Sequence, residues 1–260
     1  MECTLVISTY NWPQALDLVL KSVLRQRIMP GEVIIADDGS KEETKQLIES
    51  YKAVFPVPLI HMWHEDDGFR KTIILNKAFK AAKGEYIIQI DGDIIIHPDF
   101  ISDHLKFSEN GYYIKGSRGM LSKELTAKAL ENKKIDFSLL QPGIKSRFNV
   151  TRLPFAASLL YGKTDNTRKV KGCNFAVWKN DFIAVNGYNN EVKGWGHEDI
   201  ELAARLVNHG IKQRHLKLAA VCFHVHHELA SRHKEANNLQ SYYDVVHNKV
   251  IRCENGYDQV

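Results

Sequence analysis

Residues 85–98 read Glu85-Tyr86-Ile87-Ile88-Gln89-Ile90-Asp91-Gly92-Asp93-Ile94-Ile95-Ile96-His97-Pro98. This apolar run is rich in β-branched residues, contains two carboxylates and ends at a proline, which is typical of a buried strand. Asp91 and Asp93 are therefore expected at the end of that strand, where an unmatched carboxylate costs on the order of several kcal/mol. The pair predicts a cation, Mg²⁺ or Mn²⁺, with phosphate oxygens completing the octahedron. The alternative for this motif alone is an Asp-Gly turn whose aspartates cap the local backbone.

The chain around this stretch alternates strand patterns with helical patterns. Strands are expected at 4–8, 32–36 and 57–62, and helices from Pro13 to 24, at 41–51 and at 72–82. Asn11 is expected to cap the first helix. Strand–helix alternation predicts an α/β fold with a mainly parallel, Rossmann-like sheet flanked by helices. Ligands of such sheets bind beyond the carboxyl ends of the strands.

The composition indicates a globular protein without a metal–cysteine or disulfide framework. The chain has 260 residues, 44% hydrophobic and 25% charged, with a net charge of +4, which does not by itself point to nucleic acid. Its four cysteines are scattered without a Cys-x-x-Cys pair, which predicts reduced thiols. No leader pattern and no apolar run long enough to span a membrane is present in this sequence. A cytoplasmic location is expected, with membrane contact at most peripheral, at the inner face.

Polar clusters follow each predicted strand and together describe a nucleoside diphosphate site. Tyr10 is suited to stack on a base, Asp38 to accept from a base N–H, and Arg70 to meet phosphate. Taken singly, each also has a structural explanation, as a packing, turn or ion-paired residue. The sequence has no Gly-x-Gly-x-x-Gly after the first strand and no Gly-Lys-Ser/Thr loop, which argues against a dinucleotide dehydrogenase and a P-loop NTPase.

The motifs of the first hundred residues resemble those of family 2 glycosyltransferases with a GT-A fold. The resemblance rests on Ser8-Thr9-Tyr10-Asn11, Asp37-Asp38-Gly39-Ser40 and Asp91-Gly92-Asp93. It implies a nucleotide-diphosphate-sugar donor, with Ser8, Tyr10 and Asp38 at the base and Arg70 near the nucleotide. Asp91, Gly92 and Asp93 would form the Asp-x-Asp motif, with Asp93 the direct metal ligand.

The middle of the chain is expected to carry a long insertion at about 120–168. An edge strand is predicted at 112–116 and a helix at 122–131. The irregular remainder exceeds an ordinary connection, so it is either a lid or acceptor-binding wall or a surface insertion. We expect one domain over 1–260, with a nucleotide-sugar half at 1–110 and an acceptor-binding and catalytic half at 111–260.

The second half contains an acidic pair at a predicted helix start. A strand is expected at 170–178, and we assign Gly172 and Asn174 at its beginning to the sugar-binding side. Gly194-Trp195-Gly196-His197 then precedes Glu198-Asp199. Acidic residues there ordinarily stabilise the helix dipole. An indole between glycines, however, offers a platform for a sugar ring, and a carboxylate beside it could remove a proton from a sugar hydroxyl.

This segment resembles the catalytic region of galactosyltransferase and chondroitin-polymerase type enzymes. The resemblance implies that Trp195 and Gly196 contact sugar, that Asp199 is the general base and that Glu198 contacts the acceptor or donor sugar, although the reverse order of the acidic pair remains open. Such enzymes invert the anomeric centre by direct displacement.

Three histidines follow a predicted strand at 219–223. His224 and His226 would share one face of an extended chain and could reach one metal, while clustered surface histidines are also commonly solvated. In the related families a histidine after this strand completes the metal site. The resemblance favours His224, with His226 and His227 as the alternatives.

These features together predict a metal-dependent inverting glycosyltransferase. It would use Mn²⁺ (or Mg²⁺) and transfer a hexose or N-acetylhexosamine from a UDP-sugar to an oligosaccharide or lipid-linked glycan in cell-surface polysaccharide synthesis. No nucleic-acid partner is expected. The alternatives are a sugar nucleotidyltransferase and a non-catalytic nucleotide-sugar or glycan-binding module.

Overall fold

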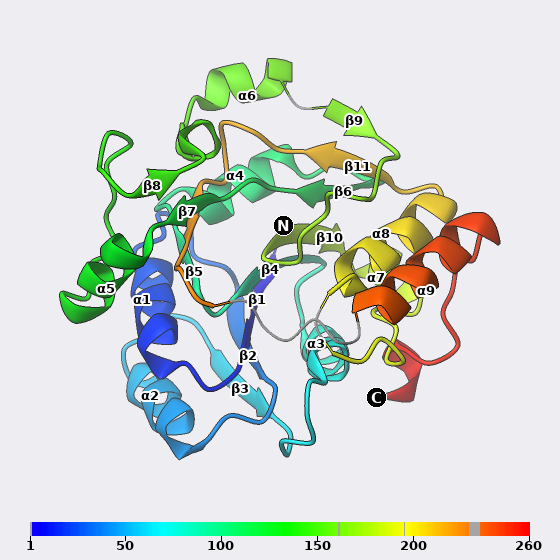
Figure 1. Cartoon of the computed structure of the whole chain (residues 1–260), viewed down its shortest axis with the longest axis horizontal. Helices are drawn as coiled ribbons and strands as arrows, with labels where there is room; N and C mark the ends of the chain where they lie inside the picture. Colours follow the sequence, from blue (N-terminus) through cyan, green and yellow to red (C-terminus); the bar gives the residue numbers. More distant parts are fainter. Residues whose placement is uncertain (1, 161, 195, 229–234) are drawn as a thin grey trace.

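We describe a computed structural model of the chain, covering residues 2–160, 162–194, 196–228 and 235–260 (Figure 1). The first half contains β1 (Cys3–Thr9), α1 (Pro13–Leu24), β2 (Glu32–Asp37), α2 (Glu42–Lys52), β3 (Leu59–Trp63), α3 (Lys71–Ala81), β4 (Tyr86–Asp91), β5 (Ile94–Ile96) and α4 (Phe100–Phe107). The second half contains β6 (Tyr112–Lys115), β7 (Gly119–Leu121), α5 (Lys123–Glu131), β8 (Ile144–Lys145), η1 (Arg147–Val150), α6 (Pro154–Leu160), β9 (Gly162–Thr164), β10 (Asn174–Trp178), α7 (Lys179–Ala184), α8 (Glu198–Asn208), β11 (Lys212–His215), β12 (Cys222–His224), α9 (Glu235–His247) and η2 (Tyr257–Gln259).

The strands form two sheets within the described residues. The larger has the order β3-β2-β1-β4-β10-β6-β11-β9, and β1, β2, β3 and β4 pair in parallel. Strand β10 joins β4 in antiparallel orientation, so both halves of the chain share this sheet. The smaller sheet has the order β5-β12-β7-β8. The predicted α/β fold with a mostly parallel sheet is confirmed.

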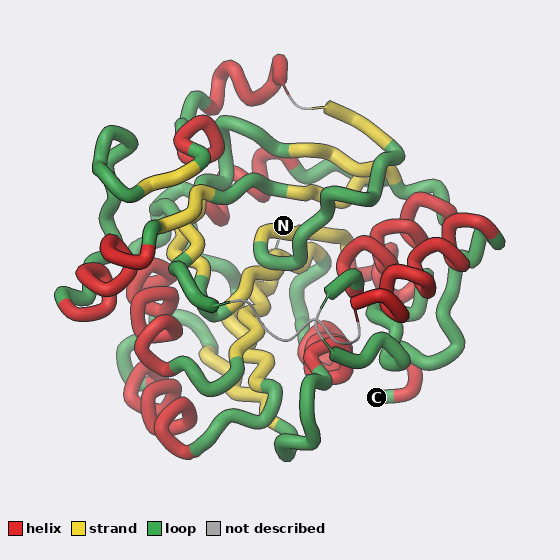
Figure 2. The backbone as a smooth tube through the Cα atoms, in the orientation of Figure 1, coloured by secondary structure: helices red, strands yellow, loops and turns green. Residues whose placement is uncertain are grey.

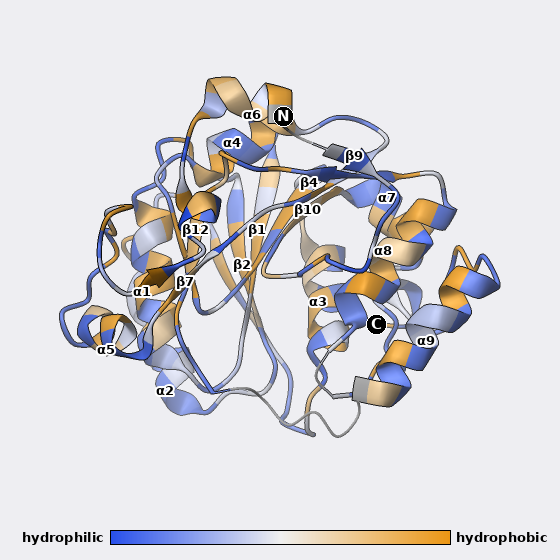
Figure 3. Cartoon of the chain, turned by 45° about the horizontal axis from the view of Figure 1, so that its top comes forward, coloured by the Kyte–Doolittle hydropathy of each residue, from blue (hydrophilic) through white to orange (hydrophobic). Residues whose placement is uncertain are grey.

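Helices cover both faces of the larger sheet, with strands between them in Figure 2. Alternate residues of one strand point to opposite faces. Leu5 and Ile7 accordingly pack with the α1 side, and Val6 packs with the α3 and α8 side. Figure 3 shows the central strands largely in the hydrophobic colour. Burial on both faces explains why β1, β2 and β4 read as continuous apolar runs.

Three local predictions were wrong or incomplete. Asn11 does not cap α1: it has a φ of 46°, and its side-chain oxygen accepts from the Lys41 amide at 2.9 Å. Strand β6 is not an edge, because it pairs with both β10 and β11. Strand β11 was not predicted, because its sequence is polar, yet Gln213 and Arg214 within it are buried.

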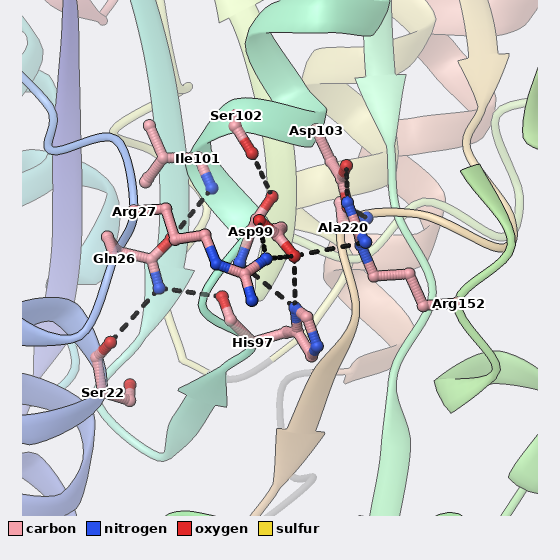
Figure 4. A network of polar contacts seen from close by, with 10 residues as sticks. All are labelled: Ser22, Gln26, Arg27, His97, Asp99, Ile101, Ser102, Asp103, Arg152 and Ala220. Atoms are coloured by element: carbon pink, nitrogen blue, oxygen red, sulfur yellow. Dashed lines mark hydrogen bonds and ion pairs between the residues drawn. The ribbon is translucent and has the colours of Figure 1, made fainter. Parts of the chain in front are cut away.

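A polar network ties segments of the second half of the chain to the first half (Figure 4). Arg152 donates to both oxygens of Asp103, at 2.8 and 3.0 Å, and its guanidinium lies 3.2 Å from the Asp99 carboxylate. Asp103 also accepts from the Ala220 amide at 2.9 Å. Asp103 of helix α4 therefore holds the chain at Arg152, before β10, and at Ala220, after β11. The second contact lies just before β12, which pairs with β5.

Glu201, the third acidic residue of the first turn of α8, has a structural role. Its carboxylate accepts two hydrogen bonds from Arg205, at 2.9 and 2.7 Å, and both side chains are fully buried. Removing one partner of such a pair leaves an uncompensated charge. This pair anchors α8. The role of Glu201 therefore differs from the roles predicted for Glu198 and Asp199.

Candidate functional site

The carboxyl ends of β1, β2 and β4 lie side by side, as parallel strands require. Ser8 is opposite Asp91 in the β1–β4 pairing. The Gly92 amide donates to the Ser8 carbonyl at 2.6 Å, and a Cβ on Gly92 would lie 2.9 Å from Thr9 Oγ1. The same Cβ would lie 3.0 Å from the Ser8 carbonyl oxygen, so the close approach of β1 favours glycine in Asp91-Gly92-Asp93.

A pocket of about 230 Å³ opens at this edge. All of the predicted nucleotide-sugar contacts except Arg70 line it: Ser8, Tyr10, Asp38, Asp91, Gly92 and Asp93. Trp12, Phe69, Lys71 and His227 also line it and were not assigned there from the sequence. Half of Tyr10 (52%) is exposed, which leaves its ring available for stacking, while its hydroxyl donates to Asp66 at 2.9 Å.

Asp38 is held in one orientation by two donors. His64 Nε2 donates to one oxygen at 2.7 Å, and the Arg70 amide donates to the other at 3.0 Å. The Arg70 guanidinium contacts the Glu65 carbonyl and lies 3.5 Å from the Asp67 carboxylate. Arg70 is absent from the described lining of the pocket, so its contact with the nucleotide stays a prediction.

Lys71 is the buried cation that links the two halves of the site. Its Nζ donates to Asp91 at 2.7 Å and lies 3.9 Å from Glu198. Burial alone would lower the pKa of Lys71, but Asp91 and Glu198 outweigh it and raise this pKa. Burial conversely raises the pKa of Asp91, and Lys71 and Ser8 reverse that effect, so the net pKa is lowered. Both groups are therefore charged at neutral pH.

Asp93, His224 and His227 form a cluster that suits a metal ion. Asp93 Oδ2 lies 3.3 Å from His224 Nε2 and 3.2 Å from His227 Nε2. One ligand atom from each residue lies within 4.8 Å of the others. His227, an alternative in the sequence analysis, thus joins His224, because β12 ends at His224 and strand alternation does not continue to His226.

The donor chemistry of this cluster fits Mn²⁺. Asp93 Oδ1 and His224 Nδ1 are buried and have no hydrogen-bond partner among the described residues. Imidazole nitrogens favour transition metals, whereas Mg²⁺ prefers oxygen ligands. One carboxylate and two imidazoles therefore favour Mn²⁺ over Mg²⁺.

The acidic pair opens into a second pocket, of about 390 Å³, which also contains Asp91, Asp93 and His224. Asp199 accepts from the Gly172 amide at 3.1 Å and from the Ile200 amide at 2.8 Å. Glu198 has one buried carboxylate oxygen without a hydrogen-bond partner in the described parts of the chain. Asp199 is thus fixed by the backbone, while Glu198 keeps a free acceptor.

Burial raises the pKa values of both acids. Burial, followed by Asp199, raises the pKa of Glu198 to about 7. Burial likewise raises the pKa of Asp199, against the opposing effect of the Gly172 amide. Perturbed, adjacent carboxyl groups in a pocket are typical of acid–base sites.

Glu198→Gln is expected to stabilise the protein at alkaline pH. The folded state binds the Glu198 proton more tightly than the unfolded chain, so its stabilisation is present below the unfolded pKa near 4.5 and is lost as the pH rises through about 7. Glutamine removes that loss, which raises the free energy of unfolding by about 1–3 kcal/mol at about pH 8. Urea unfolding at about pH 8 and about pH 5 measures it, with the exposed Glu131→Gln as control. An equal difference from wild type at both pH values would contradict this origin.

The structure places two of the predicted sugar contacts in the second pocket and one outside it. Gly172 and Gly196 line the second pocket with the acidic pair. Asn174 is not among the described residues of that lining; its amide donates to the Ser117 and Ala220 carbonyls, and its oxygen contacts His104 at 3.0 Å. Trp195 lies outside the described residues.

Comparisons with known proteins agree with this arrangement. The chondroitin synthase of Pasteurella multocida (strain Pm70) is 24% identical over 228 residues, which cover 80% of this chain and 23% of that protein. The validoxylamine A glucosyltransferase of Streptomyces hygroscopicus subsp. limoneus is 26% identical over 224 residues, which cover 80% of this chain and 48% of that protein. The chain thus spans between about a quarter and a half of the length of these two curated relatives.

Solved glycosyltransferase structures share the fold. The mannosyltransferase PcManGT from Pyrobaculum calidifontis, in complex with GDP-Man and Mn²⁺, has a TM-score of 0.64 at 17% identity over 95% of this chain and 64% of that chain. S. aureus TarS 1–349, in complex with UDP, has a TM-score of 0.64 at 15% identity over 99% of this chain and 68% of that chain. The expected GT-A fold is confirmed.

Two family matches divide the chain in the order of its motifs. Residues 152–228, which contain the acidic pair and the histidines, match the N-terminal domain of galactosyltransferase. Residues 4–155, which contain the strand ends and the Asp91-Gly92-Asp93 motif, match glycosyl transferase family 2. With this match over more than half of its length, the chain belongs to glycosyl transferase family 2.

Proposed function

We propose that this chain is a metal-dependent inverting glycosyltransferase that moves a hexose or N-acetylhexosamine from a UDP-sugar to a saccharide acceptor in cell-surface polysaccharide synthesis. The observation that carries the proposal is the meeting of three groups at one sheet edge. The pocket that Tyr10 and Asp38 line, the Asp93–His224–His227 cluster and the acidic pair adjoin one another through Asp91 and Lys71.

The donor side divides its tasks among residues of β1, β2 and β4. Tyr10 offers a stacking face, and the fixed Asp38 carboxylate accepts from a base N–H. Asp93, His224 and His227 would hold Mn²⁺. A bound Mn²⁺ supplies a Lewis acid that neutralises the charge developing on the diphosphate leaving group. Lys71 places a fixed positive charge beside the same region.

The acceptor side requires one base. In a direct displacement the acceptor hydroxyl oxygen forms a bond to the anomeric carbon, the bond from that carbon to the diphosphate breaks, and the hydroxyl proton passes to a carboxylate. We assign this base to Asp199, since two backbone amides hold it in one orientation. Glu198, with a pKa of about 7, is partly protonated at neutral pH and can donate to a sugar oxygen.

The relatives support a sugar-transferring enzyme without fixing its substrates. Chondroitin synthases and a validoxylamine A glucosyltransferase are among the curated relatives, and the structural neighbours include complexes with UDP and with GDP-Man. We propose that the donor is a UDP-sugar and that the acceptor is a saccharide or lipid-linked glycan. We also propose that residues 1–260 form one GT-A domain, with the donor half at 1–110 and the acceptor half at 111–260. The β4–β10 pairing across these halves supports a single domain.

The cellular setting is part of the same proposal. None of the helices in the described parts of the chain combines the length and apolar character that a membrane span needs. The four cysteines are free and buried. A cytoplasmic enzyme that meets its acceptor at the inner face of the membrane is consistent with these features.

A donor screen tests the proposal. The protein is incubated with Mn²⁺ and single nucleotide sugars, a panel of UDP-sugars and GDP-mannose, and release of the nucleoside diphosphate is measured. We expect slow release from one UDP-sugar, accelerated by a saccharide acceptor and lost with EDTA. Glycan binding without turnover of any donor would contradict the proposal and indicate a binding module.

A further inference from the structure

A third pocket, of about 540 Å³, adjoins the pocket of the acidic pair. It lies at the carboxyl ends of the neighbouring strands β6 and β11 and beside the segment that leads into β10. Arg118, Arg168 and Lys171 line both this pocket and the pocket of Glu198 and Asp199. The two spaces are therefore continuous.

The lining of this pocket carries positive charge that nothing in it balances. Lys115, Lys169, Lys171 and Lys217 line it together with the two arginines, and no carboxylate is among its described lining residues. None of these four lysines forms an ion pair with a described residue. Lys115 and Lys217 are half-buried, and Lys169 and Lys171 are exposed.

The crowding of these cations costs stability. Burial and then Lys169, Lys217 and Lys171 lower the pKa of Lys115 to about 8. Burial and then Lys115 and Lys217 lower the pKa of His215, which pairs with Lys115 across β6 and β11, to about 4. Like charges held together without a counter-charge destabilise the fold. An anion bound in the pocket would relieve this repulsion.

The donor diphosphate does not account for the pocket. The nucleotide pocket and this pocket have no lining residue in common among the described residues. The Asp93 cluster and Lys71, which serve the diphosphate in the proposed function, do not line it either. An anion in this pocket would therefore belong to the acceptor and not to the donor diphosphate.

We propose that the acceptor is an anionic glycan whose phosphate or carboxylate group binds among Lys115, Lys169 and Lys217 while its reacting hydroxyl lies at the acidic pair. This inference rests on the proposed function, since it names the substrate class of the same site. Phosphate and carboxylate are both negatively charged, and the described lining of the pocket has no negative charge of its own. Lysine ammonium groups act as point charges and can bind either group.

The test compares two double variants of equal charge change. Lys169→Gln/Lys217→Gln removes two pocket cations, and Lys128→Gln/Lys134→Gln removes two exposed cations near α5. The acceptors are a diphosphate-lipid-linked saccharide, a uronic-acid-containing oligosaccharide and a neutral oligosaccharide of the same length. We expect wild type to use one charged acceptor in preference to the neutral one, which also distinguishes phosphate from carboxylate.

For that charged acceptor, the pocket variant should raise KM at least about tenfold at low salt, and the difference should shrink at about 0.5 M NaCl. The pocket variant should also unfold at a higher temperature than wild type, and the control pair should match wild type in KM. Equal KM values for both double variants, or equal use of neutral and charged acceptors by wild type, would overturn the inference. Absence of donor turnover by wild type would instead overturn the proposed function.

Discussion

Replacement of Asp93 by alanine is expected to lower sugar transfer by about 10³-fold, because Asp93 supplies the only carboxylate of the metal cluster in the described parts of the chain. His224 and His227 would remain without the anion that brings a divalent cation between them. The fold should persist, since Asp93 Oδ1 has no hydrogen-bond partner among the described residues and alanine keeps the backbone carbonyl that accepts from the Val225 amide.

Two measurements separate metal loss from misfolding. Mn²⁺ binding is followed by electron paramagnetic resonance in the absence of substrates, and the unfolding midpoint is measured on the same samples. We expect Asp93→Ala to lose Mn²⁺ binding and keep its unfolding midpoint within a few degrees of wild type. The exposed Asp136→Ala, which only breaks a contact with Arg25, should match wild type in both. Wild-type Mn²⁺ affinity in Asp93→Ala would reject the assigned site.

The strand-end part of the site could be predicted from the sequence because its signal is local. An apolar run followed by acidic residues places Asp91 at the last position of β4 and Asp38 directly after β2. Parallel pairing then brings these ends together without further information. The acidic pair was equally visible, because glycines and a helix start surround it.

The contacts that the sequence did not reveal join distant segments. Lys71 lies in a polar cluster, but its proximity to Glu198 depends on how α3 and α8 pack against the same face of the sheet. His227 reaches Asp93 only because the chain leaves the strand pattern after His224. Asn174 begins a strand beside the predicted site, and its bonds to His104, Ser117 and Ala220 hold it in the lining of the third pocket and not in that of the acidic pair.

Strand β11 illustrates a second kind of failure, in which tertiary pairing overrides the pattern. Its sequence, Lys212-Gln213-Arg214-His215, has no apolar position. Arg214 is nevertheless buried, because its guanidinium contacts the Phe107 carbonyl and the Glu109 carboxylate. The same strand contributes His215 to the cationic pocket, so the element that the sequence did not predict helps to form the proposed anion site.

Asp199→Asn is expected to slow transfer by about 10²–10⁴-fold while leaving donor binding intact, which is the range for loss of a general base. Asparagine keeps an oxygen that can accept from the Gly172 or Ile200 amide, so the helix start is preserved. It cannot take up the hydroxyl proton. Transfer is measured at saturating donor and acceptor, and donor affinity is measured separately by calorimetry with UDP and Mn²⁺.

Glu198→Gln is the comparison that resolves the order of the acidic pair. Glutamine retains a donor and an acceptor, so a residue that only contacts a sugar oxygen should lose less than a base does, and we expect the smaller decrease in transfer for Glu198→Gln. The exposed Asp244→Asn of α9 should transfer at the wild-type rate. If Glu198→Gln loses more than Asp199→Asn, the base is Glu198, whose pKa of about 7 would then appear as the acidic limb of the pH–rate profile. Asp199 is held by two backbone amides, whereas Glu198 has the pKa of about 7. Comparing the two variants therefore tests whether a fixed orientation or a raised pKa determines which carboxylate acts as the base.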